Sequence, residues 1–300
     1  MVRLFLRDGG WVIGGSFMRT VDYPGGSLKS RGATDAMLIK LAGDGKLEWV
    51  KQFGGAYQDS IQHVAVDGKG NIVIQGTFKD VADWGGEKLT AAGGSDNDVV
   101  LAKYDLNGDH VWSQRFGNAF NDVAGGVTID PAGFITMAGS FDQSASFGKG
   151  DDHKSAGESD IFVARFAPAG ELQWAKTFGA DREDIASGIA TDEAGNTVIT
   201  GWFQNKVAFG STTLTSKGNK DIFALRLDVA GAVVWAQRFG DKDHDQARAI
   251  ALDSKGSAHI TGLYRFSLDT GVAGMPALQS VRADGDRIPK ADTFVLVLAR

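Results

Sequence analysis

Aspartates recur at a fixed position in this chain of 300 residues. One set lies five residues after the glycine of each Phe-Gly pair, and a second set opens a predicted strand further along the chain. Carboxylates gathered at one mouth of a molecule could bind a cation or a polar ligand. A residue that recurs in every repeat is also typical of a carboxylate that caps backbone N–H groups, and we favour that interpretation. The first set is Asp59, Asp122, Asp184 and Asp245, and the second is Asp35, Asp98, Asp160, Asp221 and Asp292.

Aromatic residues recur as well, each six residues beyond the aromatic residue that follows a repeated glycine. Rings exposed on one face could stack on sugars and make the protein a lectin. A regular aromatic residue more often anchors its own loop by packing inward, and both interpretations stay open. The set is Tyr23, Trp84, Phe147 and Phe209.

Other site chemistry is sparse. The segment from Asp241 to Asp245 alternates carboxylates as a calcium loop does, but Gln246 and Leu252 stand where glycine and glutamate are expected. The five histidines show no metal-ligand spacing, and the chain has no cysteine. We therefore predict no catalytic centre, no bound metal and no cofactor. A glycosidase that uses unlike carboxylates from different repeats is the enzymatic alternative.

The elements that must position these residues are the strands of a long repeat. A tryptophan is followed four residues later by Phe-Gly at Trp49, Trp112, Trp174 and Trp235, with spacings of 63, 62 and 61 residues. Each period has the pattern of four short strands joined by two tight turns and two longer loops, as in a propeller blade. We predict an all-β fold, a single five-bladed β-propeller of four-stranded antiparallel blades. The domain would cover residues 1–300, with blades at about 1–54, 55–117, 118–179, 180–240 and 241–300.

The fifth period departs from the others. Its connection between second and third strands, residues 265–291, is about ten residues longer and contains Arg282 and Arg287, which are candidate ligand contacts. The chain ends after the third strand of this period, so we predict a last blade that lacks its outer strand and exposes an edge along residues 293–298. Long loops share one face of a propeller, and we expect a ligand there, because the tight turns opposite are too short to build a pocket.

The repeat resembles that of a known family. The run Asp192 to Asn196, a strand ending at Gly201, and Asp160-Ile-Phe162 followed by Gly170 and Trp174 are similar to the bacterial β-propeller repeat called SBBP. The resemblance covers nearly the whole chain. It implies a secreted or surface-attached bacterial protein, in a family mostly without known activity. The family name means seven-bladed, whereas five periods are present here.

Composition and charge narrow the choice of partner. The net charge of −6 and the sequence pI of about 5.4 disfavour nucleic acid and anionic membranes as partners. The longest apolar run, residues 294–299, is too short to cross a bilayer, so we expect no membrane insertion.

These observations favour a non-enzymatic binding or scaffolding domain for an unknown protein or glycan. We expect it to be extracellular or at the bacterial cell surface, with its export signal outside this chain. The alternatives are a carbohydrate-active enzyme or lectin, and a structural spacer within a larger surface protein.

Overall fold

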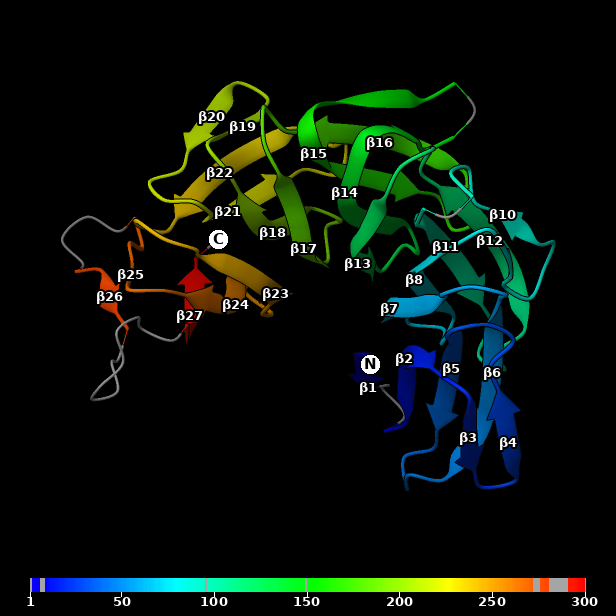
Figure 1. The fold of residues 1–300 in the computed structure, drawn as a ribbon. Helices are drawn as coiled ribbons and strands as arrows, with labels where there is room; N and C mark the ends of the chain where they lie inside the picture. The colour runs from blue at the N-terminus through cyan, green and yellow to red at the C-terminus, as the bar shows by residue number, and fades with distance from the viewer. Residues whose placement is uncertain are drawn as a thin grey trace, which may run out of the picture. The chain divides into compact units, whose positions relative to one another are not determined.

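The chain forms β-structure and no helix in the residues that its computed structural model describes (Figure 1). These are residues 9–94, 96–148, 150–271, 276–280 and 291–299, together with the backbone of residues 2–5. Contacts divide the chain into two compact units. Unit 1 contains residues 1–137, 144–154 and 165–173, and unit 2 contains residues 138–143, 155–164 and 174–300.

Each sequence period forms one antiparallel sheet, here numbered sheet 1 to sheet 5 along the chain. Sheet 1 contains β1 (Val2–Phe5), β2 (Trp11–Phe17), β5 (Asp35–Leu41) and β6 (Leu47–Gly55), and sheet 2 contains β7 (Ser60–Val66), β8 (Ile72–Phe78), β11 (Asp98–Tyr104) and β12 (His110–Phe116). Sheet 3 contains β13 (Asp122–Ile129), β14 (Ile135–Ser146), β15 (Asp152–Phe166) and β16 (Leu172–Phe178). Sheet 4 contains β17 (Asp184–Thr191), β18 (Thr197–Phe203), β21 (Asp221–Leu227) and β22 (Val233–Phe239), and sheet 5 contains β23 (Gln246–Leu252), β24 (Ala258–Tyr264) and β27 (Asp292–Leu298). The predictions of an all-β fold and of four-stranded antiparallel sheets are confirmed for the described residues, among which sheet 5 has three strands. Sheet 1 is extended to six strands, because a hairpin of the second period, β9 (Val81–Asp83) and β10 (Leu89–Thr90), pairs with β6.

The connection between second and third strands is not the plain loop that the sequence predicts. In most periods it contains a small hairpin, visible for β19 and β20 beside sheet 4 in Figure 1, whereas in sheet 3 the long strands β14 and β15 extend through it. In sheets 1, 2, 4 and 5 a residue with positive φ directs the chain into this excursion two positions after the second strand: Arg19, Asp80, Asn205 and Phe266. In sheet 3 the corresponding residue, Gln143, lies within β14 and also has positive φ. The added strands are β3 (Thr20–Tyr23), β4 (Gly26–Lys29), β9 (Val81–Asp83), β10 (Leu89–Thr90), β19 (Lys206–Phe209), β20 (Thr212–Thr215), β25 (Ser267–Leu268) and β26 (Leu278–Gln279).

The glycine that ends each second strand fits against its own sheet. A methyl group added at Gly76 would lie 2.0 Å from the carbonyl oxygen of Ser60, and one at Gly201 would lie 1.9 Å from that of Ile185. The first strand is bulged beside both glycines. The close approach that requires glycine here is therefore to the first strand of the same sheet.

The core lies between consecutive sheets. In unit 1, Val12, Ala36 and Leu38 of sheet 1 pack with buried residues of sheet 2. In unit 2, one apolar cluster joins sheets 3 and 4, and another joins sheets 4 and 5. Central strands such as β8, β11 and β21 are buried at every residue, because apolar neighbours cover both of their faces.

Candidate functional site

The repeated tryptophan connects each of sheets 1, 2 and 3 to the sheet that follows it. The indole Nε1 of Trp49 donates to the carbonyl of Leu106 at 3.3 Å, and the indole of Trp174 donates to Val229 at 3.1 Å. Both acceptors lie in the tight turn between the third and fourth strands of the following sheet, as does Pro168, the acceptor for Trp112. The glycine of that turn lies against the ring: a methyl group at Gly231 would be 2.9 Å from Trp174. In the pattern Gly-x-x-x-Trp, the glycine therefore lies against the tryptophan of the preceding sheet, and the tryptophan contacts the turn of the following sheet.

The phenylalanine of each Phe-Gly pair enters the core of the next sheet. The ring of Phe53 lies 4.9 Å from Tyr104 and 5.8 Å from Trp84, centroid to centroid. Phe178 lies 5.4 Å from Phe209 of the sheet that follows. Rings at these separations add attraction beyond the burial of their surface.

The glycine of each Phe-Gly pair lies against carboxylates of the predicted sets, against one from each set at Gly117 and Gly240. Gly117 has φ of 118°, and a methyl group there would lie 2.0 Å from Asp122 Oδ2 and 3.4 Å from Asp98 Cγ. Gly240 has φ of 137° and is placed in the same way against Asp221 and Asp245. Each junction between consecutive sheets therefore contains a buried aspartate pair.

The predicted ring aspartates cap backbone N–H groups, as the favoured interpretation expected. Asp59 Oδ2 accepts from the N–H of Gly55 at 2.7 Å, and Asp184 and Asp245 each accept at 2.9 Å from the residue four positions earlier. Asp122 accepts from Asn118 at 3.2 Å. Members of the second set cap the preceding loop in the same manner, as Asp98 does for Ala92. All four first-set carboxylates are at most 2% exposed, so none is presented to a ligand from solvent.

Burial changes the acidity of these pairs. Desolvation raises the pKa of Asp59 to about 6, of Asp245 to about 7 and of Asp184 to about 8. The residue three positions after the tryptophan contacts the second-set aspartate in two of these pairs. Arg115 donates to Asp98 at 2.7 Å, which opposes the rise that burial causes in the pKa of Asp98, and Arg238 donates to Asp221 at 2.6 Å. In the junction of sheets 3 and 4 this position is Thr177, which carries no charge.

A recurring cation escaped the sequence analysis. Arg165 of β15 pairs with Asp130, and Arg226 of β21 pairs with Asp192 at 2.6 Å, so each guanidinium holds the tight turn of its own sheet. The signal was available, because a lysine or arginine follows the strand-opening aspartate by five residues in four periods, at Lys40, Lys103, Arg165 and Arg226. In the fifth period this position is Val297.

The aromatic set does not form an exposed platform. Trp84, Phe147 and Phe209 are at most 1% exposed, and Tyr23 alone of the four is partly accessible. The proposed contribution of Trp84, Phe147 and Phe209 to ligand binding is therefore wrong. They anchor their own hairpins, and Trp84 and Phe209 also receive the phenylalanine of the preceding sheet.

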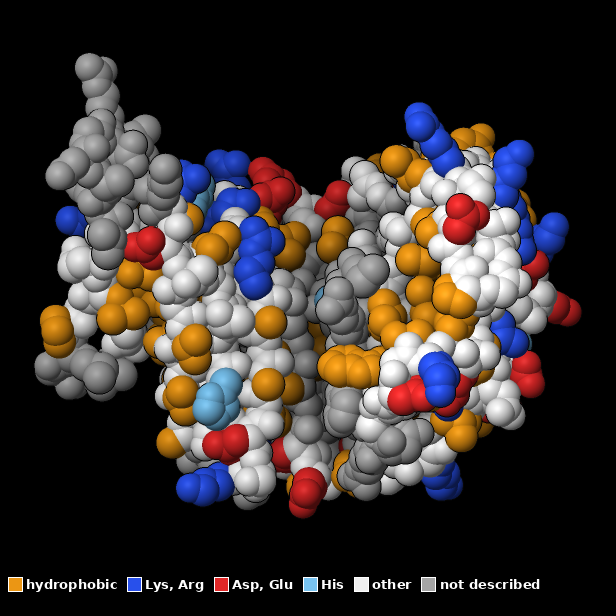
Figure 2. Space-filling view, turned by 90° about the horizontal axis from the view of Figure 1, so that it is seen from below, with side chains coloured by type: hydrophobic (Ala, Val, Ile, Leu, Met, Phe, Trp, Pro, Cys, Tyr) orange, Lys and Arg blue, Asp and Glu red, His pale blue; other side chains and the backbone are white. Residues whose placement is uncertain are grey.

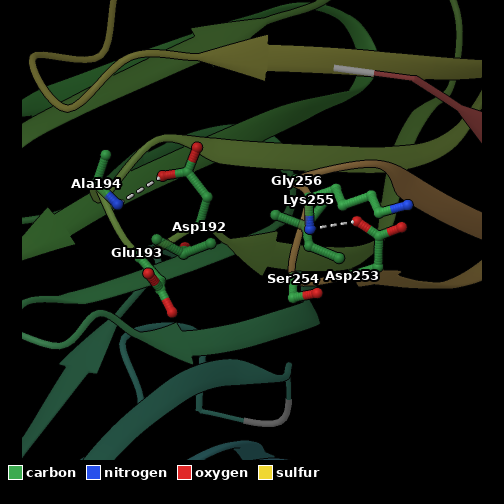
Figure 3. Close-up of a pocket in the computed structure, with 9 residues that line it drawn as sticks. Asp192, Glu193, Ala194, Asp253, Ser254, Lys255 and Gly256 are labelled. Atoms are coloured by element: carbon green, nitrogen blue, oxygen red, sulfur yellow. Dashed lines mark hydrogen bonds between the residues drawn. The ribbon is translucent and has the colours of Figure 1, made fainter.

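Pockets occur at both ends of the sheets. One, of about 460 Å³, lies among the long connections of unit 2 and is lined by Arg182, Asn205 and Asn219. Another, of about 450 Å³, lies between the tight turns of sheets 4 and 5 (Figure 3). The expectation that tight turns are too short to build a pocket is wrong, because two adjacent turns line one together. Asp192 accepts a hydrogen bond from the N–H of Ala194, and Asp253 accepts one from the N–H of Lys255, each within its own turn.

The remaining candidates are placed as follows. Among the described residues, no three His, Cys, Asp or Glu side chains are grouped to hold a metal ion. Asp241 accepts from Ser267 instead. No helix of the described chain is long and apolar enough to cross a membrane. Arg282 and Arg287 lie outside the described residues. On the face drawn in Figure 2, side chains of both charges are interspersed with apolar ones.

No family model matches the chain. The chain is 22% identical over 249 residues to an uncharacterized WD repeat-containing protein, L264, of Acanthamoeba polyphaga mimivirus, which covers 69% of this chain and 18% of that protein. It is 28% identical over 145 residues to the regulatory protein FlaEY of Caulobacter vibrioides, covering 45% of this chain and 15% of that protein. The chain thus spans less than a fifth of the length of these relatives. The WD-repeat relative supports a repeat protein of the propeller type. The SBBP resemblance stays a prediction.

Two solved structures are similar over most of the chain. A protein of unknown function from Bacteroides caccae has a TM-score of 0.43 at 10% identity and covers 94% of this chain and 72% of its own. A glucose dehydrogenase has a TM-score of 0.40 at 14% identity and covers 86% and 78%. Scores this low carry no argument about fold or activity.

Proposed function

We propose that this chain is a non-enzymatic binding or scaffolding β-propeller. The observation that carries the proposal is the use of its recurring polar and aromatic side chains. The ring aspartates cap backbone N–H groups at junctions between sheets, and the recurring rings fill the core. Because these recurring residues hold the sheets together in every period, they favour a scaffold whose surface loops recognise a partner.

We further propose that the five sheets are blades of one closed ring. The turn glycine of sheet 1, Gly45, has nothing within 4 Å where Gly108, Gly170 and Gly231 meet an indole. At the other end of the chain, Val295 and Val297 of β27 are 67% and 58% exposed. Both observations support closure, because in a ring every sheet has a neighbour on each face, and sheets 1 and 5 would cover these open positions.

Closure predicts a compact particle in solution. For 300 residues, a compact domain has a radius of gyration of about 19 Å. Small-angle X-ray scattering at several concentrations would measure it. A clearly larger radius for the monomer would contradict a closed ring.

The partner proposed is a protein or a glycan at the long-loop end of the sheets. The pocket beside Arg182 and Asn219 and the long connection of the fifth period support this end. The net charge of −6 supports a partner other than nucleic acid. The resemblance to surface repeats supports an extracellular or cell-surface location in bacteria.

Binding without turnover is the expected result on a glycan array and on the polysaccharides it identifies. Arg282→Ala combined with Arg287→Ala should weaken binding at least tenfold if these cations contact the ligand. Lys255→Ala is the matched control, because Lys255 is an exposed cation in the tight turn of the same sheet. Release of reducing ends would instead establish the carbohydrate-active enzyme. Failure to bind any glycan or envelope protein would favour the structural spacer.

A further inference from the structure

One pocket of unit 2 lies where two long connections of sheet 4 meet. The connection that enters β17 supplies Arg182, and the connection between β18 and β21 supplies the other lining residues. The volume of about 460 Å³ is in the range that small ligands occupy. Every side chain that lines the pocket in the described part of the chain is polar: Arg182, Gln204, Asn205, Ser216 and Asn219, together with Gly218.

Two of these residues belong to the repeat. Ser216 Oγ donates to the carbonyl of Gly218, two residues further along the chain, at 3.0 Å. Ser30 and Ser155 make the same hydrogen bond in sheets 1 and 3. This part of the lining therefore shapes the connection itself and does not indicate a ligand.

Arg182 and Asn219, by contrast, depart from the repeat. Two residues before the first-set aspartate, where sheet 4 has Arg182, the other periods have Tyr57, Phe120 and Asp243. Two residues before the second-set aspartate, where sheet 4 has Asn219, the three preceding periods have Ala33, Asp96 and Glu158. A residue that the scaffold needs recurs from period to period, whereas departures from a shared pattern are typical of functional sites.

The amide groups of the pocket are held in place and unpaired. The backbone N–H of Gln204 donates to the carbonyl of Glu183 at 3.1 Å, and that of Asn219 donates to the carbonyl of Asp243 at 3.1 Å. The side-chain amides of Gln204, Asn205 and Asn219 make no hydrogen bond to another described residue. Because an amide presents both a donor and an acceptor, three of them match a ligand that carries several hydroxyl groups.

An ion pair joins the two connections beside the pocket. Lys220 Nζ lies 3.3 Å from Glu183 Oε2 and 3.5 Å from the centre of the Trp202 ring. Lys220 follows Asn219 in the chain and Glu183 follows Arg182, so these contacts hold the backbone on both sides of the pocket. A pocket that is formed before its ligand arrives loses less entropy on binding.

Arg182 is the charged residue of the lining, and its partner within the protein is weakly held. Its guanidinium donates to Glu158 at 3.1 Å, but the two side chains are 61% and 54% exposed. Exposed pairs contribute little stability, so a ligand carboxylate can replace Glu158 and accept the two parallel hydrogen bonds that a guanidinium favours. A protein partner is disfavoured, because the lining offers no apolar side chain to anchor one.

We propose that this pocket binds a sugar acid, such as a uronic acid residue of a glycan. Arg182 binds the carboxylate of the sugar, and the amides of Gln204, Asn205 and Asn219 bind its hydroxyl groups. The inference rests on the proposed function, because it names the class of ligand that binds at the long-loop end of the sheets.

The test measures binding to the full chain by calorimetry, with trisaccharides of galacturonic acid and of glucuronic acid as probes. At least one of the two acids should bind, and its methyl ester should bind at least about tenfold more weakly, because esterification removes the charge that Arg182 recognises. No binding of either acid, or equal binding of acid and ester, would overturn the proposal. A poly-aspartate peptide that binds as tightly as the acids would assign the pocket to a protein ligand and overturn it as well.

Two substitutions with opposite expected effects make the matched comparison. Arg182→Ala should weaken binding of the acid at least about tenfold. Glu158→Gln should strengthen it about twofold or more, because this change frees Arg182 from its partner. Lys46→Ala is the control and should leave binding unchanged, since Lys46 is an exposed cation paired with Asp44 in a tight turn.

The outcomes separate this site from the proposed function. Binding of the acid that Arg182→Ala leaves unchanged would overturn the site and would still support a binding domain. Binding that depends on Arg182 and is followed by cleavage of the trisaccharide would support the site and overturn the non-enzymatic function.

Discussion

Replacing Gly117 with alanine is expected to lower the free energy of unfolding by about 3 kcal/mol or more. Gly117 has φ of 118°, a backbone conformation that side chains disfavour. The added methyl group would also lie 2.0 Å from Asp122 Oδ2, which is held in place by its hydrogen bond from Asn118. Relief of the clash requires moving a buried carboxylate away from the backbone that it caps. Urea unfolding followed by circular dichroism measures the change.

Gly68→Ala is the control for this substitution. Gly68 lies in the tight turn of the same sheet, and a methyl group there meets nothing within 4 Å. The free energy of unfolding of Gly68→Ala should stay within about 0.5 kcal/mol of that of the parent protein. Comparable losses for the two variants would show that general glycine effects, rather than the aspartate pair, set the result. If Gly117→Ala fails to fold, Gly240→Ala tests the same feature at 2.8 Å from Asp221.

Asp184→Asn is expected to remove a large part of the pH dependence of stability. Burial raises the pKa of Asp184 from 3.8 to about 8, so the folded protein favours the protonated form. The stabilisation is therefore fully present below about pH 4 and is lost as the pH rises to about 8. In that window Asp184 contributes a slope of up to about 1.4 kcal/mol per pH unit. Unfolding curves from pH 4 to pH 9 measure it, and the variant should gain stability relative to the parent as the pH rises.

The cause of the raised pKa of Asp184 can be tested by a substitution at the neighbouring Thr177. Asp160 also has a pKa raised by burial, and it adds to the rise at Asp184. Thr177→Arg places at this junction the guanidinium that Arg115 and Arg238 supply at two others. It should reduce the loss of stability near pH 8 while leaving stability at pH 4 little changed. Parallel pH profiles for the parent protein and Asp184→Asn would contradict the assignment to Asp184.

The turn residues made the order of the strands predictable from the sequence. The contacts between residues far apart in the sequence were not predicted. The turn from Asp130 to Gly133 forms the expected hydrogen bond at 2.9 Å, because aspartate and glycine favour that turn wherever it occurs. By contrast, Trp49 and Leu106 lie 57 residues apart, and nothing local shows that they meet. The same limit applies to Trp84: its spacing fits both an exposed platform and a buried anchor, and only the packing of Phe53 against it decides.

The contact between successive sheets has a direction. Each of the first three periods presents a tryptophan to the period after it, which receives that tryptophan with a turn glycine. The phenylalanines Phe53 and Phe178 likewise pack on core rings of the following sheet. Such a head-to-tail interface is matched by any further copy of the same unit. A gene of this kind can therefore gain or lose a whole period by unequal recombination and still encode neighbours that fit, so that the number of sheets can change in a single genetic event.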